Sequence, residues 1–211
     1  MKILGIFEAS RRKGTAFVTH FFWRWDQTFL QVRRYAENGQ CGPLRSVRFT
    51  YARPKKFAVD RHTFFYDRFG AMLDAACELG GGLPEVLHLN PSKDSNLMYG
   101  LARFSSGIAC EFECHECLPD SMPDICYVKG NYANGHVTNQ PVAGYFNEEG
   151  FVCADDEKCR ILSADYPEME AVEGPVEHMF ARFRTAVERG LVKPGPDRAA
   201  ELVKRIREVL P

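Results

Sequence analysis

The stretch TAFVTHFFWRWDQTFLQVRRYAENGQCGPLRSVRFTYARP, residues 15–54, predicts a strand, a helix and a second strand in immediate succession. Thr15–Trp25 is rich in β-branched and aromatic residues, which favour strands. Asp26 is a suitable N-cap for a helix over Thr28–Asn38, because its carboxylate can accept a hydrogen bond from the first turn. Leu44–Arg53 then predicts a half-buried strand, since its apolar and polar residues alternate.

The rest of the chain places most strands in its middle and helices near its ends. Strands are predicted over Glu85–Leu89, Asn96–Phe104, Ile108–Cys117, Ile125–Lys129, His136–Thr138, Phe151–Cys153 and Lys158–Leu162. Helices are predicted over Ile3–Lys13, Arg68–Leu79, residues 175–190 and Asp197–Leu210, with a loop over Pro54–Tyr66. This order predicts one α+β domain over residues 1–211, an open, mostly antiparallel sheet with helices packed on one face.

The composition is that of an ordinary globular protein. Of 211 residues, 45% are hydrophobic and 26% are charged, and the formal net charge is −1. Lys and Arg are scattered, so neither nucleic acid nor an anionic membrane is an expected partner. The sequence contains no run of about 18 apolar residues, the length needed to span a bilayer. The opening MKILGIFEASRRKG makes a poor signal peptide. A cytoplasmic location is therefore expected.

The segment IACEFECHEC invites a metal-site interpretation. A strand, however, places Cys110 and Cys114 on one face and His115 and Cys117 on the other. A tetrahedral zinc site needs four ligands that converge on one point. No metal is therefore expected, and reduced, small buried thiols are the favoured interpretation of this cluster.

A sheet with helices on one face leaves its other face open. Two of the predicted strands carry alternating apolar sets, Val47/Phe49/Tyr51 and Ile108/Cys110/Phe112. These sets offer enough apolar side chains for both faces of the sheet. Because a large apolar patch usually marks an interface, we expect a homodimer formed through the open sheet face.

Four segments resemble, in their order and spacing, the C-terminal domain of the glucose–fructose oxidoreductase/inositol dehydrogenase (Gfo/Idh/MocA) family. They are Phe22-Trp23-Arg24-Trp25 with Gly39 and Gly42, the helix FGAMLDAACELGG, the hairpin LARFSSGIACEFE, and the ending FRTAVERGL followed by RAAELVKRIREVL. Together they cover most of residues 4–211. The resemblance implies an open-faced sheet that packs against another subunit, and NAD(P)-dependent oxidation or reduction of sugars and related polyols.

The sequence departs from this family in the parts that carry cofactor chemistry. The family's glycine-rich fingerprint and catalytic lysine lie in a Rossmann domain, and no G-x-G-x-x-G follows a predicted strand here. The triple glycine Gly80–Gly82 follows a helix, which is the wrong context for cradling phosphates. We therefore expect no cofactor to be bound by this chain alone. NAD(P) is expected only if a Rossmann-domain partner supplies its site.

The resemblance also points to candidate catalytic residues on the helix over Arg68–Leu79. Asp74 matches the family's Asp, and Glu78 stands where the family has His. A carboxylate can transfer protons near neutrality only if its pKa is raised. Helical spacing places both on the face opposite a predicted buried stripe of Phe69, Met72, Leu73, Ala76 and Leu79. The alternative is that they form the solvated side of an amphipathic helix.

The candidate substrate-binding residues are Arg24, its neighbour Trp23, and Lys55. Arg beside aromatic residues is common in sugar and phosphate sites, and Lys55 follows a strand end, from which it could reach a substrate phosphate. The alternatives are a packed tryptophan covered by an arginine, and a solvated loop lysine.

Three functional hypotheses follow. The first is a substrate-binding and oligomerisation domain of the Gfo/Idh/MocA type, not catalytic without a cofactor domain. The second is a non-redox module that binds a sugar-like ligand or a protein partner. The third is a thiol-dependent metal or redox protein built on the Cys110–Cys117 segment.

Overall fold

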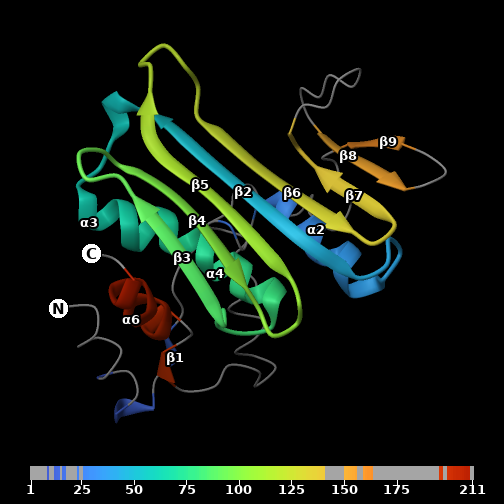
Figure 1. Cartoon of the computed structure of the whole chain (residues 1–211), viewed down its shortest axis with the longest axis horizontal. Helices are drawn as coiled ribbons and strands as arrows, with labels where there is room; N and C mark the ends of the chain where they lie inside the picture. Colours follow the sequence, from blue (N-terminus) through green and yellow to red (C-terminus); the bar gives the residue numbers. More distant parts are fainter. Residues whose placement is uncertain are drawn as a thin grey trace.

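The computed structural model describes residues 9, 12–14, 16–17, 23, 26–140, 150–155, 159–163, 195–196 and 199–209. Within these residues, eight strands form one sheet in the order β3–β4–β5–β2–β6–β7–β8–β9 (Figure 1). The strands are β2 (Leu44–Pro54), β3 (Val86–Pro91), β4 (Leu97–Arg103), β5 (Ala109–Leu118), β6 (Ile125–Tyr132), β7 (Gly135–Thr138), β8 (Gly150–Asp155) and β9 (Cys159–Ser163). Only β2 and β5 run parallel, and the other neighbouring pairs are antiparallel. The predicted mostly antiparallel sheet is confirmed.

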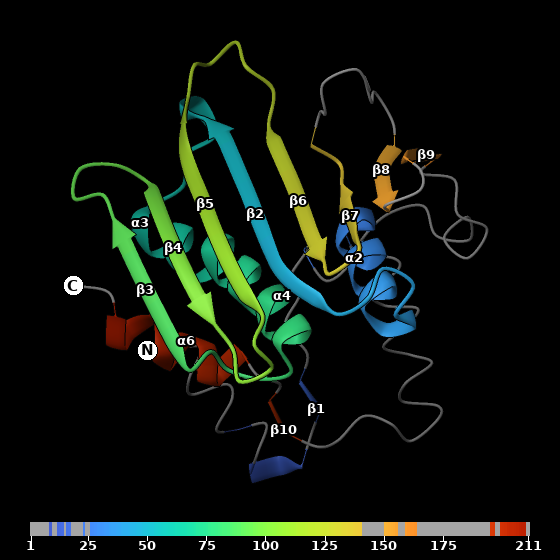
Figure 2. The ribbon, with the colours of Figure 1, turned by 45° about the vertical axis from the view of Figure 1, so that its right-hand side comes forward.

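The described helices pack on one face of this sheet, as predicted. They are α2 (Gln27–Asn38), α3 (Arg61–Thr63), the π-helical turn η3 (Phe64–Phe69), α4 (Gly70–Gly80) and α6 (Ala199–Val209). In Figures 1 and 2, α2 and α4 lie behind the long strands, and α6 contacts α4, η3 and β3. A short parallel pair, β1 (Ala16–Phe17) with β10 (Gly195–Pro196), forms a separate sheet. The α+β class is therefore confirmed.

The two faces of the large sheet differ because side chains alternate along each strand. Phe49 of β2 packs against Phe29 of α2 and stacks on Phe112 of β5, with ring centroids 6.4 and 5.9 Å apart. The register of the parallel pair aligns Val47 with Cys110 and Phe49 with Phe112. Both alternating apolar sets consequently face the helices. The expectation that they supply apolar side chains to both faces is wrong.

Helix α2 forms as its sequence predicts and lies close over β6. The Asp26 carboxylate accepts a hydrogen bond from the Phe29 N–H at 3.0 Å, and Gly39, with φ 68°, ends the helix. A Cβ atom at Gly130 of β6 would lie 2.9 Å from Cγ1 of Val32. Glycine at this position therefore lets the helix approach the sheet.

The predicted strand over Thr15–Trp25 is wrong at its C-terminal end. Only Ala16–Phe17 is extended among the described residues of this stretch, and Trp23 lies in a short helical turn. The Trp23 ring is fully buried and meets Phe49 edge-on at 5.4 Å. Packing beneath the sheet, rather than pairing within it, accounts for the tryptophan. Residues 18–22, 24 and 25 lie outside the described part.

The predicted loop over Pro54–Tyr66 is also wrong. It contains a 3-10 turn, η2 (Lys55–Phe57), and then α3, which leads through η3 directly into α4. Asp60 caps this helical run, because its carboxylate accepts hydrogen bonds from the Thr63 N–H at 3.1 Å and from the Thr63 hydroxyl at 2.6 Å. The helix therefore begins at Arg61 rather than at Arg68.

The remaining predicted elements fall near their expected positions where the structure describes them. The strands of the β4–β5 hairpin, β3 and β6–β9 are confirmed to within a few residues. Near the N-terminus, residues 9, 12 and 13 are helical and Gly14 has φ 63°. The helix α6 confirms the prediction over Asp197–Leu210. The predicted helix at 175–190 lies outside the described residues.

Candidate functional site

The helix that carries the candidate catalytic residues is buried nearly all round. Asp74 of α4 is 0% exposed, so its predicted place on a solvated face is wrong. The whole run from Gly70 to Cys77 is buried, because α4 lies under the sheet and contacts α2 and α6 as well. The helix sequence GAMLDAACELG carries only two charged side chains, which is typical of a helix enclosed on every side.

Glu78, the second candidate, is tied to a neighbouring helix. Arg33 of α2 donates a hydrogen bond to the Glu78 carboxylate, and the same guanidinium reaches Glu37 at 3.3 Å. The Glu78 carboxylate is thus held in an ion pair between the two helices. The contact therefore joins α2 to α4, and the geometry favours a structural role for Glu78.

The candidate substrate-binding residues are not brought together by any contact between the described side chains. Trp23 belongs to the core against Phe49. Lys55 is exposed on η2, beyond the end of β2. Arg24 lies outside the described residues. The packed alternative for Trp23 and the solvated alternative for Lys55 are the ones that the structure favours.

The cysteines of β5 behave as the strand pattern predicts. Cys110 and Cys114 are buried on the helix-covered face, and the Cys117 thiol on the other face lies 3.7 Å from the Asn96 carbonyl. Burial raises the pKa of Cys110 and of Cys114. Both thiols are therefore protonated at neutral pH, which counts against a reactive thiolate here.

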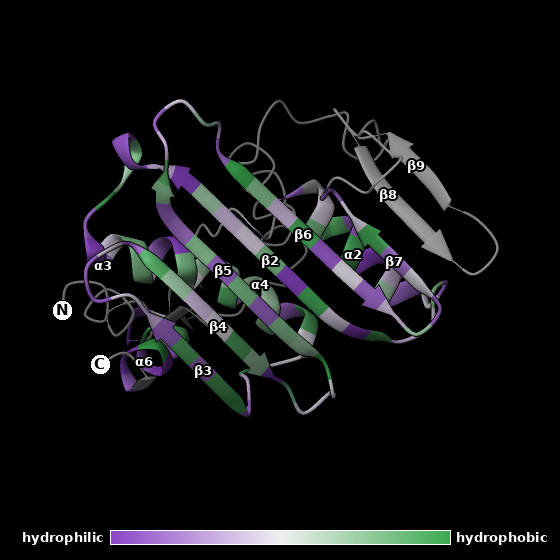
Figure 3. Cartoon of the chain, turned by 45° about the horizontal axis from the view of Figure 1, so that its top comes forward, coloured by the Kyte–Doolittle hydropathy of each residue, from purple (hydrophilic) through white to green (hydrophobic). Residues whose placement is uncertain are grey.

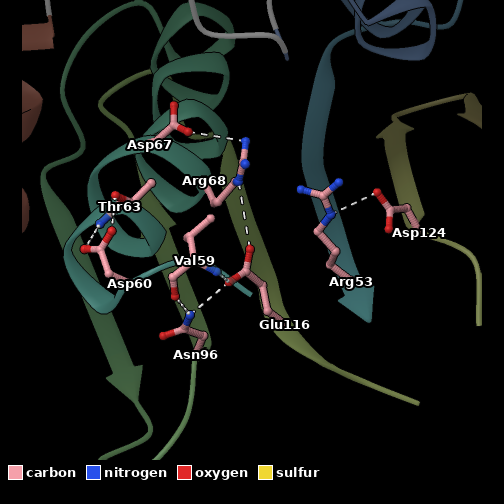
Figure 4. A network of polar contacts seen from close by, with 9 residues as sticks. All are labelled: Arg53, Val59, Asp60, Thr63, Asp67, Arg68, Asn96, Glu116 and Asp124. Atoms are coloured by element: carbon pink, nitrogen blue, oxygen red, sulfur yellow. Dashed lines mark hydrogen bonds and ion pairs between the residues drawn. The ribbon is translucent and has the colours of Figure 1, made fainter. Parts of the chain in front are cut away.

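A buried carboxylate organises the end of the sheet beneath α3 and η3 (Figure 4). The Glu116 side chain of β5 is fully buried, and its Oε2 accepts hydrogen bonds from the Val59 N–H at 2.8 Å and from the Asn96 amide at 2.9 Å. Arg68 of η3 approaches the same carboxylate at 3.9 Å and pairs with Asp67 at 3.3 Å. These contacts fasten the segment before α4 to the sheet.

The open face of the sheet carries two rows of side chains that run across the strands. One row is His88, Leu101, Glu111, Arg48 and Lys129. The next is Asn90, Tyr99, Glu113, Thr50 and Tyr127. Polar and apolar residues alternate along these strands in Figure 3. No described helix covers it.

A groove of about 380 Å³ lies between these rows, over β3, β4, β5 and β2. We call it the open-face groove; its lining residues are Arg48, His88, Leu89, Asn90, Tyr99, Gly100, Leu101, Glu111, Phe112 and Glu113. Tyr99 and Leu101 are 47% and 57% exposed. The groove leaves no signal in the sequence, because its residues meet only once the strand order places β4 beside β5 and β5 beside β2.

The triple glycine Gly80–Gly82 does not form the phosphate-binding turn of a dinucleotide site. Such a site needs a glycine-rich turn from a strand into the N-terminus of a helix. Here Gly80 is the last residue of α4 and Gly81, with φ 78°, is its C-cap. The C-terminus of a helix carries partial negative charge, which repels phosphate.

Among the described residues, no helix is long and apolar enough to cross a membrane.

Several solved oxidoreductase structures have a similar fold. A dehydrogenase from Clostridium difficile is 11% identical, with a TM-score of 0.70 over 97% of this chain and 65% of that one. An oxidoreductase from Agrobacterium radiobacter, in complex with NAD+, L-tartaric acid and magnesium, is 14% identical, with a TM-score of 0.66 over 92% and 61%. A 3-ketoreductase from Actinomadura kijaniata, in complex with NADP, is 14% identical, with a TM-score of 0.58 over 96% and 61%.

The chain thus spans less than two thirds of the length of each of these oxidoreductases. At these identities the likeness establishes the fold and not the activity. No protein-family model and no curated protein matches the chain. The fold that the resemblance to the Gfo/Idh/MocA family implied is confirmed.

Proposed function

We propose that this chain is the C-terminal, substrate-binding and oligomerisation domain of a Gfo/Idh/MocA-type NAD(P)-dependent dehydrogenase of sugars or polyols, and that it acts in the cytoplasm. One observation carries the proposal: nearly the whole chain matches a part, under two thirds, of oxidoreductases whose structures hold NAD+ or NADP. The fold of this chain, an open sheet with helices on one face, is similar to that part of each of these oxidoreductases. The domain does not catalyse the reaction by itself.

The dinucleotide in this proposal is bound by a Rossmann-type domain outside the described residues. The geometry around Gly80–Gly82 supports this division, because these glycines end a helix rather than begin one. The helix-covered face of the sheet is packed with the buried side chains of the hydrophobic core.

Titration of the purified chain with NADH and NADPH tests this division of labour. We expect no binding at low micromolar concentration, because a phosphate-cradling helix N-terminus is lacking among the described elements. The readout is nicotinamide fluorescence, checked by calorimetry. Low-micromolar binding of either nucleotide to this chain alone would contradict the proposal.

A homodimer formed through the open sheet face is the second part of the proposal. Tyr99 and Leu101 place exposed apolar surface on β4, and the Arg48–Glu111 pair beside them supplies charges of both signs, as a self-complementary surface needs. We expect light scattering at micromolar concentration to give twice the chain mass. A Leu101→Lys variant should shift the mass toward that of one chain, and a wild-type monomer would refute the dimer.

The runner-up function is a non-redox module that binds a sugar-like ligand or a protein partner. The open-face groove favours it, since a concave site lined by apolar and hydrogen-bonding side chains is typical of ligand pockets. A thermal-shift screen with polyols and nucleotide sugars separates the ligand-binding form from the protein-binding form. Stabilisation by a polyol, without nucleotide binding, supports the module.

A further inference from the structure

The open-face groove has an uneven charge distribution. On one row, the Arg48 guanidinium binds the Glu111 carboxylate, with Nε 2.7 Å from Oε2, and so neutralises it. On the next row, the basic group that contacts the Glu113 carboxylate, among the described residues, is the imidazole of His115, 3.9 Å away. Burial lowers the pKa of His115, although Glu113 opposes that shift. The imidazole is therefore neutral at pH 7 and leaves the charge of Glu113 uncompensated.

An aromatic ring and an amide lie beside the Glu113 carboxylate. Tyr99 stands directly opposite Glu113 in the antiparallel register, and Asn90 stands opposite Tyr99 on the far side. The Tyr99 ring is 47% exposed, and Leu101 beside it adds an apolar wall. A carboxylate, an aromatic face and an amide oxygen thus border one apolar groove. An aromatic face and a carboxylate both attract cations.

We propose that the open-face groove binds an organic cation, an ammonium or guanidinium group carried on an apolar stem. The cationic head lies between the Glu113 carboxylate and the Tyr99 ring, and the stem lies along Leu101. Anionic ligands are disfavoured, because the groove holds two carboxylates and one guanidinium. The volume of about 380 Å³ is at the lower end of the range for ligand sites and suits one small molecule or one side chain.

The same chemistry can come from two sources. One is a free alkylammonium or alkylguanidinium ligand. The other is a lysine or arginine side chain of a second copy of this chain, seated on the open face. This inference goes beyond the proposed function, since it requires neither a nucleotide nor a dehydrogenase reaction, although its second source rests on the proposed homodimer.

Titration with n-butylguanidinium, followed by amide NMR, tests the proposal, with uncharged n-butylurea as the matched ligand control. We expect saturable shifts at Tyr99 and Glu113 with the guanidinium compound and at least tenfold weaker binding of the urea. Glu113→Gln and Tyr99→Leu should each weaken binding about tenfold. Two matched controls should leave it within about twofold: Tyr127→Leu, on the same row but outside the groove, and Glu85→Gln, exposed just before β3 and outside the groove.

Light scattering of wild type, Glu113→Gln and Glu85→Gln distinguishes the two sources. If the guanidinium compound does not bind and only Glu113→Gln dissociates a wild-type dimer, the second copy supplies the cation. If neither effect is seen, or if n-butylurea binds as tightly as n-butylguanidinium, the proposal is overturned. A wild-type dimer that Glu113→Gln leaves intact would, in the absence of guanidinium binding, overturn this inference and leave the proposed dimer standing.

Discussion

Replacing Glu116 with alanine lowers the free energy of unfolding by about 3–5 kcal/mol, the loss expected when one partner of a buried charged network is removed. The change leaves the Val59 N–H without its acceptor, removes one of the two acceptors of the Asn96 amide, which keeps the Val59 carbonyl, and leaves Arg68 with Asp67 alone. Each buried donor that loses its acceptor adds a desolvation penalty of about 1–3 kcal/mol. Urea denaturation followed by circular dichroism measures the loss.

Two further variants give this measurement its controls. Glu116→Gln keeps an oxygen that can accept both hydrogen bonds but removes the charge beside Arg68, so we expect a smaller loss than with alanine. Glu111→Ala removes a carboxylate from the same strand, where the Arg48–Glu111 pair is about half exposed, and should change stability by about 1 kcal/mol or less. Equal losses in Glu116→Ala and Glu111→Ala would show that the buried network stabilises the fold no more than the half-exposed Arg48–Glu111 pair does.

The strands could be predicted because the alternation of apolar and polar residues, a local property, determines them. Alternation along β2 and β5 depends only on neighbouring residues, and it correctly identifies which side chains share a face. The caps behave in the same way: Asp26 and Asp60 both act through the residue three positions later. Asp60 could have been found from its sequence context, but the π-helical turn that follows shifts the apolar residues away from regular helical spacing.

The burial of α4 could not be predicted from the helical spacing of its apolar residues. A helical wheel assumes one covered side, and under that assumption Asp74 and Glu78 lie on the solvated side. In the structure, α4 lies under the sheet and also contacts α2, α6 and η3. Asp74 is consequently buried, and Glu78 meets Arg33, a residue 45 positions away in the sequence. Contacts at such sequence distances depend on the topology, which local patterns do not determine.

The open-face groove could not be predicted for a related reason. Its lining residues come from four strands that are neighbours in the sheet but not all consecutive in the sequence, because β5 lies between β4 and β2. A sequence reading identifies Glu111 and Glu113 as alternate residues on one face, but it does not say that Arg48 neutralises the first and Tyr99 stands opposite the second. Strand order and register decide which carboxylate keeps its charge uncompensated.

The second large effect is expected at the centre of the covered face, where Phe49 contacts three other aromatic side chains of the core. Its ring lies 5.4 Å from Trp23, 6.4 Å from Phe29 of α2 and 5.9 Å from Phe112 of β5. The residue is fully buried. Phe49→Ala should therefore lower the free energy of unfolding by about 3–5 kcal/mol, since it removes a buried ring and leaves a cavity. Chemical denaturation of the purified variant measures this loss.

Neighbouring positions on β2 supply the matched controls for Phe49. Phe49→Leu keeps much of the apolar volume but loses the aromatic contacts, so its loss should be clearly smaller than that of alanine. Thr50→Ala changes the next residue, whose side chain points to the open face, and should stay within about 0.5 kcal/mol of wild type. The predicted contrast between Phe49 and Thr50 depends on the helices covering one face alone. Comparable losses at both positions would therefore mean that the face carrying Thr50 is packed as tightly as the face carrying Phe49, and the assignment of an open face to this sheet would be wrong.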